Sequence, residues 1–272
     1  MPEINKYAVM GNPVSHSLSP RIHQMFARQC GIALEYSAIK VEEGNFSDAV
    51  IQFRKDGGKG LNITVPFKLE AWQLSDLRSP RAQIAGAVNT LKFDGADKIF
   101  GDNTDGVGIL RDVTANLHKP VMDAKILVIG AGGAVRGILG PLLEAQPASL
   151  HIVNRTAVKA RELAAVFSKI GPCTGGGLDE TGTGSYDIII NGTAASLYNK
   201  VPDLPASIFT AETLVYDMMY STGPIPFLAW ASEQGAGICS DGLGMLVEQA
   251  AESFFIWHAV RPDTKPVMQA LR

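Results

Sequence analysis

Short apolar runs alternate along the chain with longer stretches whose apolar residues recur at helical spacing. The runs YAVM (7–10), ILVI (126–129) and III (188–190) are typical of strands that are buried on both faces. Amphipathic stretches follow such runs, for example at residues 20–31 and 157–167. Strands that alternate with helices form βα units, so the pattern predicts an α/β protein with mainly parallel sheets and helices on both faces.

The alternation begins again at AKILVIG (124–130), after the irregular polar segment GDNTDG (101–106). This restart indicates two domains, an N-terminal α/β domain over residues 1–105 and a Rossmann-type domain over 106–238. A chain crossing between two domains creates a cleft, and such clefts commonly bind ligands. The segment CTGGGLDETGTGSY (173–186) is rich in turn-forming residues and predicts an exposed loop.

Composition and charge exclude several classes of protein. The chain has 272 residues, 46% hydrophobic and 19% charged, which is typical of globular proteins and not of disordered ones. A net charge of −3 without a Lys/Arg-rich run argues against nucleic-acid and membrane partners. The N-terminus lacks a signal-like pattern, so we expect a cytoplasmic protein. The three cysteines and five histidines show neither disulfide nor metal-ligand spacing, so no metal site is predicted.

The segment KILVIGAGGAVRG (125–137) predicts a dinucleotide site. A strand runs directly into Gly130, Ala131, Gly132 and Gly133, and a helix-like stretch begins near Ala134. Gly130 permits a tight turn, Gly132 lets the backbone approach a pyrophosphate, and the helix offers free N–H groups and the positive end of its dipole. The sixth position of the GxGxxG pattern is not glycine, so the motif is a variant.

The tip of the next strand favours NADP over NAD. A carboxylate about 20 residues after the glycines usually binds the ribose 2′-hydroxyl of NAD. Here the run SLHIV (149–153) ends instead in Asn154, Arg155 and Thr156. The planar cation of Arg155, with Lys159 about one turn later, is suited to a 2′-phosphate. The alternative is that Arg155, Lys159 and Arg161 form a solvated helix face.

Polar residues follow four strand-like runs in the N-terminal half, in HSLSP, NITVPFK, AGAVNT and GDNTDG. Ligands of open α/β sheets bind at the carboxyl ends of the strands, so we expect these side chains to converge there. Short hydroxyl and amide groups with a single lysine suit a small polyhydroxylated acid. The set consists of Ser17, Ser19, Thr64, Lys68, Asn89 and Asp105.

Each member of this set also has a purely structural interpretation. Ser19 and Asp105 are typical helix N-caps, and Asn62 and Asn89 are residue types that satisfy turn backbones. Lys68 is typical of an exposed lysine at the start of a helix. The recurrence of such groups at four successive strand ends favours a ligand site.

Seven motifs, in this order, resemble the shikimate dehydrogenase family: GNPVSHSLSP, LNITVPFK, GAVNT, GDNTDG, GAGGA, NRT and DGLGMLVEQAA. The resemblance extends from residue 7 to residue 251 and is more specific than a Rossmann signature alone. It implies an NADP-dependent oxidoreductase that interconverts 3-dehydroshikimate and shikimate in aromatic amino-acid biosynthesis. It also implies that the C-terminal helix returns to the first domain, so that residues 239–272 complete that domain.

The resemblance implies roles for individual residues. Lys68 and Asp105 would be the catalytic acid–base pair. The substrate-binding residues would be Ser17 and Ser19 for the carboxylate, Thr64, Asn89 and Gln249 for ring hydroxyls, and Tyr220 for a further contact. The cofactor-binding residues would be Gly130, Ala131, Gly132, Gly133, Ala134, Asn154, Arg155, Thr156, Lys159, Met218 and Gly242. The segment NGTAASL (191–197) departs from the family pattern and leaves the contacts of that loop undefined.

Other functions fit parts of the pattern. A quinate/shikimate dehydrogenase would accept an extra hydroxyl and often NAD, which Arg155 disfavours. A sensor that binds NADP without turnover would not need the pair Lys68 and Asp105. A glutamyl-tRNA reductase-like protein would need a catalytic cysteine near the N-terminus and a basic RNA-binding surface. The sequence leaves the oligomeric state, including a homodimer, undetermined.

Overall fold

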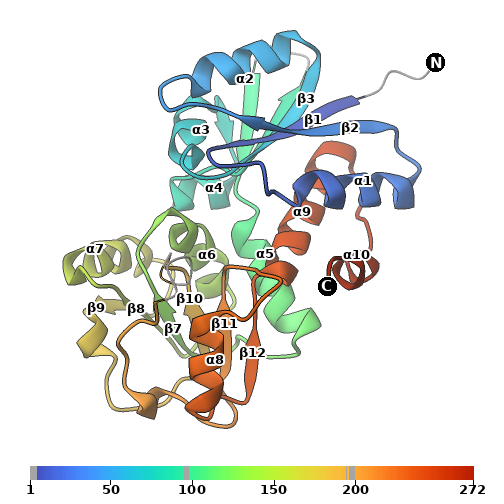
Figure 1. Ribbon diagram of the computed structural model, residues 1–272. Helices are drawn as coiled ribbons and strands as arrows, with labels where there is room; N and C mark the ends of the chain where they lie inside the picture. Colours follow the sequence, from blue (N-terminus) through green and yellow to red (C-terminus); the bar gives the residue numbers. More distant parts are fainter. Residues whose placement is uncertain (1–4, 95–97, 194, 196–199) are drawn as a thin grey trace. The chain divides into compact units, whose positions relative to one another are not determined.

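The computed structural model describes residues 5–94, 98–193, 195 and 200–272. The chain divides into two compact units, Met1–Gly108 with Val247–Arg272 (unit 1) and Ile109–Leu246 (unit 2). Each unit contains one six-stranded sheet with helices packed against it (Figure 1). Among the described residues, no helix combines the length and the apolar composition that a membrane crossing requires.

Unit 1 is built on a mixed sheet. Its strands are β1 (Asn5–Gly11), β2 (Leu34–Lys40), β3 (Gly58–Ile63), β4 (Leu77–Arg78), β5 (Thr90–Asp94) and β6 (Lys98–Asp102). They lie in the order β2-β1-β3-β5-β6-β4. Strand β5 runs antiparallel to both β3 and β6, whereas the other neighbours are parallel. The C-terminal ends of β1, β3 and β6 and the beginning of β5 therefore lie along the same end of the sheet, which is called the sheet edge below.

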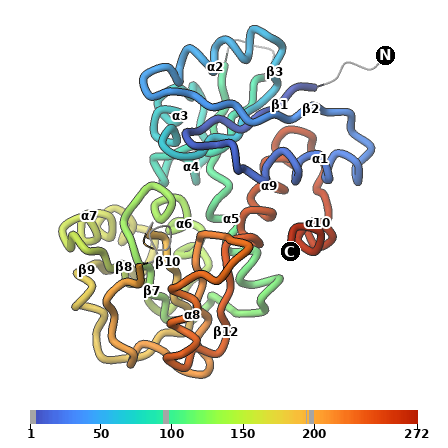
Figure 2. Tube along the Cα trace, viewed as in Figure 1, coloured from blue at the N-terminus to red at the C-terminus, as the bar shows by residue number. Residues whose placement is uncertain are grey.

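Helices cover both faces of this sheet. The helices of unit 1 are α1 (Ser19–Cys30), α2 (Phe46–Lys55), α3 (Lys68–Leu74), α4 (Pro80–Ala85) and α10 (Lys265–Leu271), and it shares α5 (Asp105–Arg111) and α9 (Leu243–His258) with unit 2. Helix α5 leads into unit 2, and α9 leads back into unit 1. Figure 2 follows the C-terminal segment, in red, back to α1, where Arg21 Nη2 donates to the carbonyl of Ala270 at 2.8 Å.

The alternation along β1 explains the two cores of unit 1. Ala8 and Met10 belong to the core cluster that includes Phe46 of α2. Tyr7 and Val9 point the other way, into the cluster that includes Trp257 of α9. Because a strand between two helical layers is buried on both faces, the continuous apolar run YAVM is what this position requires.

Unit 2 is built on a parallel sheet. Its strands are β7 (Lys125–Ile129), β8 (Ser149–Val153), β9 (Cys173–Gly176), β10 (Ile188–Asn191), β11 (Leu214–Asp217) and β12 (Ile238–Ser240). Their order, β12-β11-β10-β7-β8-β9, reverses direction between β7 and β10. This is the strand order of the Rossmann fold, which binds dinucleotides at the carboxyl ends of the strands beside that reversal.

The helices of unit 2 connect these strands. The α-helices are α6 (Gly133–Glu144), α7 (Ala157–Phe167) and α8 (Pro226–Glu233). Shorter segments are the π-helix η1 (Asp112–Asn116) and the 3₁₀ helices η2 (Leu178–Glu180) and η4 (Ala206–Ile208). The predicted α/β class, with a Rossmann-like second domain and a returning C-terminal helix, is confirmed.

Two segments differ from the sequence-based expectation. The mainly parallel pattern missed β5 and β6, which pair antiparallel because a connection of a few residues can join only antiparallel neighbours. Residues 173–186, predicted as an exposed loop, contain the edge strand β9. Gly175 is needed there for packing, since a Cβ atom at this position would overlap the carbonyl of Ala160 in α7. At Gly175, the turn-forming composition of segment 173–186 therefore reflects a close contact between β9 and α7.

Candidate active site

Lys68 and Asp105 meet at the edge of the unit 1 sheet. Lys68 is the first residue of α3, and Asp105 is the first residue of α5. The Nζ atom of Lys68 donates to Oδ2 of Asp105 at 2.5 Å, and 21% of the Lys68 side chain and 7% of the Asp105 side chain are exposed. A partly exposed ammonium beside a buried carboxylate can give a proton to a ligand and regain one from solvent.

The backbone around Lys68 places it beside the next strand. Phe67 is fully buried, and its N–H donates to the carbonyl of Thr64 at 3.1 Å, which closes the turn after β3. The carbonyl of Lys68 accepts from the N–H of Val88 at 2.9 Å. Because Val88 comes directly before Asn89, this bond brings Asn89 to the same place as Lys68.

Asn89 is the centre of a buried hydrogen-bond network and is only 2% exposed. The two hydrogens of its amide nitrogen are shared among three acceptors, Oδ1 of Asp105 at 2.8 Å, Oγ1 of Thr104 at 2.9 Å and Oε1 of Gln249 at 3.3 Å. Its amide oxygen accepts from the backbone N–H of Thr104 at 2.9 Å. Hydrogen bonds to both the amide nitrogen and the amide oxygen therefore fix the orientation of the Asn89 side chain.

Helix α9 adds Ser253 to this network, and β3 adds Asn62. The Nδ2 atom of Asn62 donates to Oγ of Ser253 at 2.9 Å, and Ser253 shares a hydrogen bond with Thr90 at 2.8 Å. Asn62 lies inside a strand and is 6% exposed, so its interpretation as a turn residue is wrong. The signal for Asn62 was a polar residue between the apolar residues Leu61 and Ile63, whereas Ser253 had no distinguishing pattern.

Ser17 and Ser19 lie at the start of α1. The backbone N–H of Ser19 donates to Oγ of Ser17 at 3.2 Å, and Leu18 occupies the N-cap position, so Ser19 is not the helix cap. Ser19 is buried, and its side chain hydrogen-bonds Tyr36. The Tyr36 hydroxyl in turn donates to Oδ1 of Asn62 at 2.7 Å. This chain of contacts connects the serine loop to the network around Asn89.

Thr64 completes the sheet edge between β1 and the start of α3. It is half-buried, and its backbone N–H donates to the carbonyl of Met10 at 2.9 Å. Gly11 is required beside it, because a Cβ atom at that position would overlap the methyl group of Thr64. The contacts thus gather Thr64, Lys68, Asn89, Asp105 and Gln249 in unit 1, with Ser17 and Ser19 linked to them through Tyr36.

Two titratable side chains are buried beneath this network. His23 is fully buried and stacks on Tyr36 with ring centroids 4.4 Å apart. Burial, with a smaller contribution from His258, lowers the pKa of His23 to about 3. Burial also raises the pKa of Tyr36 well above its usual range. Both side chains are therefore neutral near pH 7.

The glycine turn follows β7 in unit 2. Gly130 has a φ of 112°, in the left-handed region that favours glycine, and its N–H donates to the carbonyl of Val153 at 2.7 Å. Helix α6 begins three residues later, and the first N–H groups of a helix have no partner within the helix, which suits an anion. The other residues of the turn are half-buried or exposed; they are Ala131, Gly132, Gly133 and Ala134.

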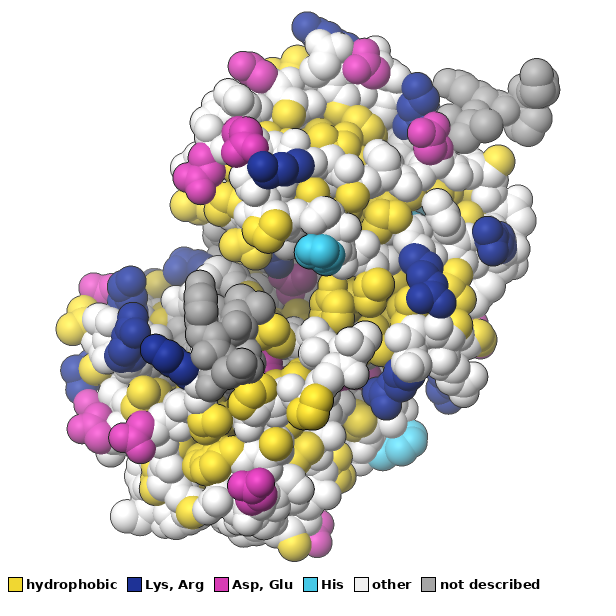
Figure 3. Space-filling model, in the orientation of Figure 1, with side chains coloured by type: hydrophobic (Ala, Val, Ile, Leu, Met, Phe, Trp, Pro, Cys, Tyr) yellow, Lys and Arg dark blue, Asp and Glu magenta, His cyan; other side chains and the backbone are white. Residues whose placement is uncertain are grey.

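The residues after β8 form a basic surface. Asn154 donates from Nδ2 to the carbonyl of Thr156 at 3.0 Å, which shapes the turn into α7. Arg155, Thr156 and Lys159 are exposed, and within the described part of the chain neither Arg155 nor Lys159 forms an ion pair. Lys and Arg side chains gather over α7 in Figure 3. Two exposed cations without a carboxylate partner suit a phosphate group.

Arg161 has a different environment from Arg155 and Lys159. Its Nη2 atom lies 2.6 and 2.9 Å from the two carboxylate oxygens of Glu180. Arg161 therefore holds α7 to the segment after β9 and is engaged in that contact. Of the three cations on this predicted helix face, Arg155 and Lys159 are the two that remain open to a ligand.

Asn191 and Asp217 are fully buried at the ends of β10 and β11. The Nδ2 atom of Asn191 donates to Oδ2 of Asp217 at 2.8 Å, and Oδ1 of Asp217 accepts from the N–H of Met219 at 2.9 Å. The hydroxyl of Thr193 donates to Oδ1 of Asn191 at 2.7 Å. These bonds hold the chain around Met218, whose N–H donates to the carbonyl of Asn191 at 2.9 Å.

Met218 and Gly242 lie side by side in unit 2. A Cβ atom at Gly242 would overlap the carbonyl of Met218, so the close approach requires glycine. Tyr220 is half-buried in the same unit, and its contact with a substrate stays a prediction. Of the divergent segment 191–197, residues 194, 196 and 197 lie outside the described residues.

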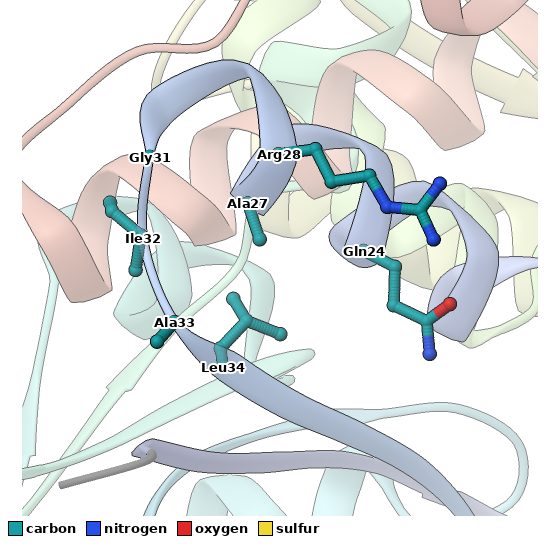
Figure 4. Close-up of a pocket in the computed structure, with 7 residues that line it drawn as sticks. All are labelled: Gln24, Ala27, Arg28, Gly31, Ile32, Ala33 and Leu34. Atoms are coloured by element: carbon teal, nitrogen blue, oxygen red, sulfur yellow. The ribbon is translucent and has the colours of Figure 1, made fainter. Parts of the chain in front are cut away.

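A separate groove lies between the end of α1 and the beginning of β2. It has a volume of about 520 Å³, and Gln24 and Arg28 extend from α1 in the same direction (Figure 4). None of the predicted site residues lines it. The part of the chain that the structure describes contains no group of three His, Cys, Asp or Glu side chains arranged to hold a metal ion.

Comparison with known protein families gives matches along most of the chain. The model "Shikimate dehydrogenase substrate binding domain" matches residues 9–91. The model "Shikimate / quinate 5-dehydrogenase" matches residues 112–200, and "Shikimate 5′-dehydrogenase C-terminal domain" matches residues 242–272. The first match contains Ser17, Ser19, Thr64, Lys68 and Asn89.

Individual proteins are similar over nearly the full length. A shikimate dehydrogenase (NADP(+)) of Aromatoleum aromaticum is 54% identical over 99% of this chain and 97% of its own. The crystal structure of an Ael1 enzyme from Pseudomonas putida is 46% identical, with a TM-score of 0.92 over 98% of both chains. The shikimate 5-dehydrogenase of Thermus thermophilus, in complex with NADP(H) and shikimate, is 31% identical, with a TM-score of 0.87 over 98% of both chains.

Proposed function

Because this chain belongs to the shikimate dehydrogenase family, we propose that it catalyses the reversible, NADPH-dependent reduction of 3-dehydroshikimate to shikimate. The reaction is a step of aromatic amino-acid biosynthesis. The observation that carries the proposal is the contact of 2.5 Å between Lys68 and Asp105, surrounded by the amides of Asn89 and Gln249 at the sheet edge.

The residues of unit 2 fit NADP. The glycine turn at the start of α6 suits a pyrophosphate, and Arg155 and Lys159 suit a 2′-phosphate. The tip of β8 carries Asn154 where a carboxylate would select NAD, so a negatively charged phosphate meets no repulsion there. Met218 and Gly242 would flank the nicotinamide.

Lys68 would supply the proton in the reduction. NADPH, when bound, supplies the hydride that adds to the carbonyl carbon of 3-dehydroshikimate. The Lys68 ammonium donates a proton to the carbonyl oxygen, which becomes the hydroxyl of shikimate. In the reverse direction neutral Lys68 removes that proton from the hydroxyl. Asp105 accepts a hydrogen bond from Lys68 and keeps the Nζ atom of Lys68 directed at the reacting oxygen.

The other residues at the sheet edge would hold the substrate. Ser17 and Ser19 suit the carboxylate, since hydroxyl and backbone N–H groups donate hydrogen bonds to anions. Thr64, Asn89 and Gln249 suit ring hydroxyls, because each can donate or accept, and Tyr220 would add a further contact. The domain ranges expected from the sequence, 1–105 with 239–272 for substrate and 106–238 for cofactor, belong to the same proposal.

An absorbance assay with the purified full chain tests the function. Shikimate is offered with NADP⁺ or with NAD⁺, quinate is offered as a comparison substrate, and reduced nicotinamide is followed. We expect turnover with shikimate and NADP⁺ and much slower turnover with NAD⁺ or quinate. Comparable rates with quinate would indicate the broader quinate/shikimate dehydrogenase. NADP⁺ binding without turnover of either substrate would overturn the enzyme assignment and indicate a sensor.

Two broader expectations belong to this proposal. The enzyme acts on a small molecule in the cytoplasm, which cell fractionation tests. Its oligomeric state, a monomer or a homodimer, follows from the mass measured by light scattering.

A further inference from the structure

Four charged side chains form a cluster in unit 1, and the hydroxyl of Ser79 also donates to Oδ1 of Asp102. Arg81 of α4 donates from Nε and Nη2 to the two oxygens of Asp102, each at 2.7 Å. The Nη2 atom of Arg81 also donates to Oε1 of Glu252 in α9 at 3.1 Å. The other oxygen of Glu252 accepts from Arg261 at 2.5 Å. Two arginines and two carboxylates thus compensate each other's charge.

The carboxylates of the cluster are buried. Asp102 is 4% exposed and Glu252 is 7% exposed. Burial by itself would raise the pKa of Glu252, but Arg261 and Arg81 hold it below its usual range. A buried carboxylate that loses its partner is strongly destabilised, so the positions of both carboxylates depend on the arginines.

Each carboxylate is close in sequence to a residue of the candidate site. Asp102 ends β6 three residues before Asp105, and its Oδ1 atom also accepts from the N–H of Asn103 at 2.7 Å. Glu252 lies three residues after Gln249 in α9, and residues three apart in a helix are neighbours on its surface. Arg81 therefore contacts the chain just before Asp105 and the helix turn next to Gln249.

We propose that Arg81 is a positioning residue, which holds the segment from Asp102 to Asp105 at a constant distance from the turn of α9 that carries Gln249. The inference rests on the proposed function, since both residues are assigned there to chemistry or substrate binding. The planar guanidinium suits this task because its N–H groups reach two carboxylates in a defined geometry. Without it, Asp102 and Glu252 would move apart, and the amide and carboxylate groups that face the substrate would move with them.

Three variants of the full chain test the inference. Arg81→Leu removes both contacts, and Arg81→Lys keeps the charge but not the planar fork. Arg261→Leu is the matched control. It removes the second arginine that donates to Glu252, and Arg261 makes no contact with Asp102 among the described hydrogen bonds and ion pairs. For each variant, kcat, the KM for shikimate, the KM for NADP⁺ and the unfolding midpoint are measured, and kinetics are recorded well below the lowest midpoint.

We expect kcat/KM for shikimate to fall about 100-fold in Arg81→Leu, because displacements of about 1 Å have effects of this size. The KM for NADP⁺ should not change, since the cluster lies in unit 1. Arg81→Lys should be intermediate. Arg261→Leu should lose stability and keep kcat/KM.

A lower midpoint in Arg81→Leu with unchanged kcat/KM would overturn the inference, and so would equal kinetic losses in Arg81→Leu and Arg261→Leu. If Arg81→Leu does not fold, Arg81→Lys carries the same comparison against Arg261→Leu. A wild-type enzyme that does not turn over shikimate would overturn the proposed function, and the inference with it. The two failures are distinguished by the wild-type assay.

Discussion

The amide of Asn89 donates to one oxygen of the Asp105 carboxylate at 2.8 Å, opposite the oxygen that accepts from Lys68 at 2.5 Å. The carboxylate is therefore held from both sides, and the direction of the Lys68 ammonium is set by a group that cannot rotate freely. A proton donor with a defined direction is what the reduction of a ketone requires.

Replacing Lys68 by alanine should remove the proton donor without affecting unit 2. We expect Lys68→Ala to lower kcat by about 100- to 10,000-fold, the usual contribution of a general acid. NADP⁺ affinity, measured by fluorescence titration, should stay at the wild-type value. Lys98→Ala, at an exposed lysine of the same sheet, is the control and should keep wild-type activity. Equal losses of NADP⁺ affinity and of kcat in Lys68→Ala would contradict the assignment.

Replacing Asn89 by alanine should affect both stability and substrate binding. The change leaves the buried Oδ1 of Asp105 without the donor Asn89 and the backbone N–H of Thr104 without its acceptor, which costs about 1–3 kcal/mol in the free energy of unfolding. Denaturant titration measures that loss. The KM for shikimate should rise as well, because Asn89 is proposed to contact the substrate. A stability loss with unchanged kinetic constants would remove Asn89 from the substrate site.

The cofactor preference should depend on Arg155 and Lys159 but not on Arg161. Loss of one charge-assisted hydrogen bond to a phosphate, about 1.5–3 kcal/mol, corresponds to a rise of about 10- to 150-fold in the KM for NADP⁺. We expect this rise in Arg155→Ala and Lys159→Ala, with the KM for NAD⁺ unchanged. Arg161→Ala is the matched control, because Glu180 already engages that side chain. A similar rise in all three variants would favour a general effect of surface charge.

Stability should decrease in acid because of His23. Its pKa is about 3 in the folded chain, against an ordinary 6.5, so the unfolded chain binds the proton more readily. The stabilisation is complete above pH 6.5 and is lost as the pH falls from 6.5 toward 3, by about 1.4 kcal/mol per pH unit for this group.

The comparison that tests this is urea unfolding of wild type and His23→Phe between pH 7 and pH 4. The phenyl ring suits the surrounding aromatic side chains, which include Tyr36 and Phe26. The pH slope of the free energy of unfolding should be smaller in the variant. His258 also faces His23, and its own lowered pKa contributes a residual slope. Identical slopes in the two proteins would refute the assignment to His23.

The C-terminal end of α9 offers a stabilising substitution. Ala259 has a φ of 56°, in the left-handed region where a side chain is unfavourable and glycine is preferred. Ala259→Gly should raise the free energy of unfolding by about 0.5–1 kcal/mol, after the greater freedom of glycine in the unfolded chain is subtracted. Ala229→Gly, at an exposed position inside α8, should lower it by about 1 kcal/mol. Urea denaturation of both variants shows whether the signs are opposite.

The positions of many candidate site residues in the fold were predictable because these residues lie in contiguous motifs. The glycine turn lies between β7 and α6, and Arg155 and Lys159 follow β8, as the local order of strand, turn and helix indicated. Lys68 and Asp105 each begin a helix at the end of a strand or turn, which is also a local feature. That the two meet over a separation of 37 positions was expected from the convergence of strand ends, whereas their pairing as acid and base was implied by the family resemblance.

Some residues could not be assigned because their role depends on what packs against them. Asn62 in a strand is indistinguishable by pattern from a turn residue until Tyr36 and Ser253 are placed beside it. Arg161 has the same local context as Lys159, and only the position of Glu180 separates them. The pairing of Arg81 with Glu252 spans 171 positions and leaves no periodic signal in the chain.

The sequence by itself determined the α/β class and the buried strands, because burial and helical period are local properties of residue order. It indicated the type of chemistry through seven ordered motifs that resemble those of one family. It also determined the glycine turn, since the need for a small residue at a left-handed or crowded position acts on each residue individually. Only the tertiary structure decided the mixed sheet of unit 1, the hydrogen-bond partners of Asn89 and the charge cluster around Arg81. These depend on which distant segments become neighbours, and that is decided by the free energy of packing the whole unit.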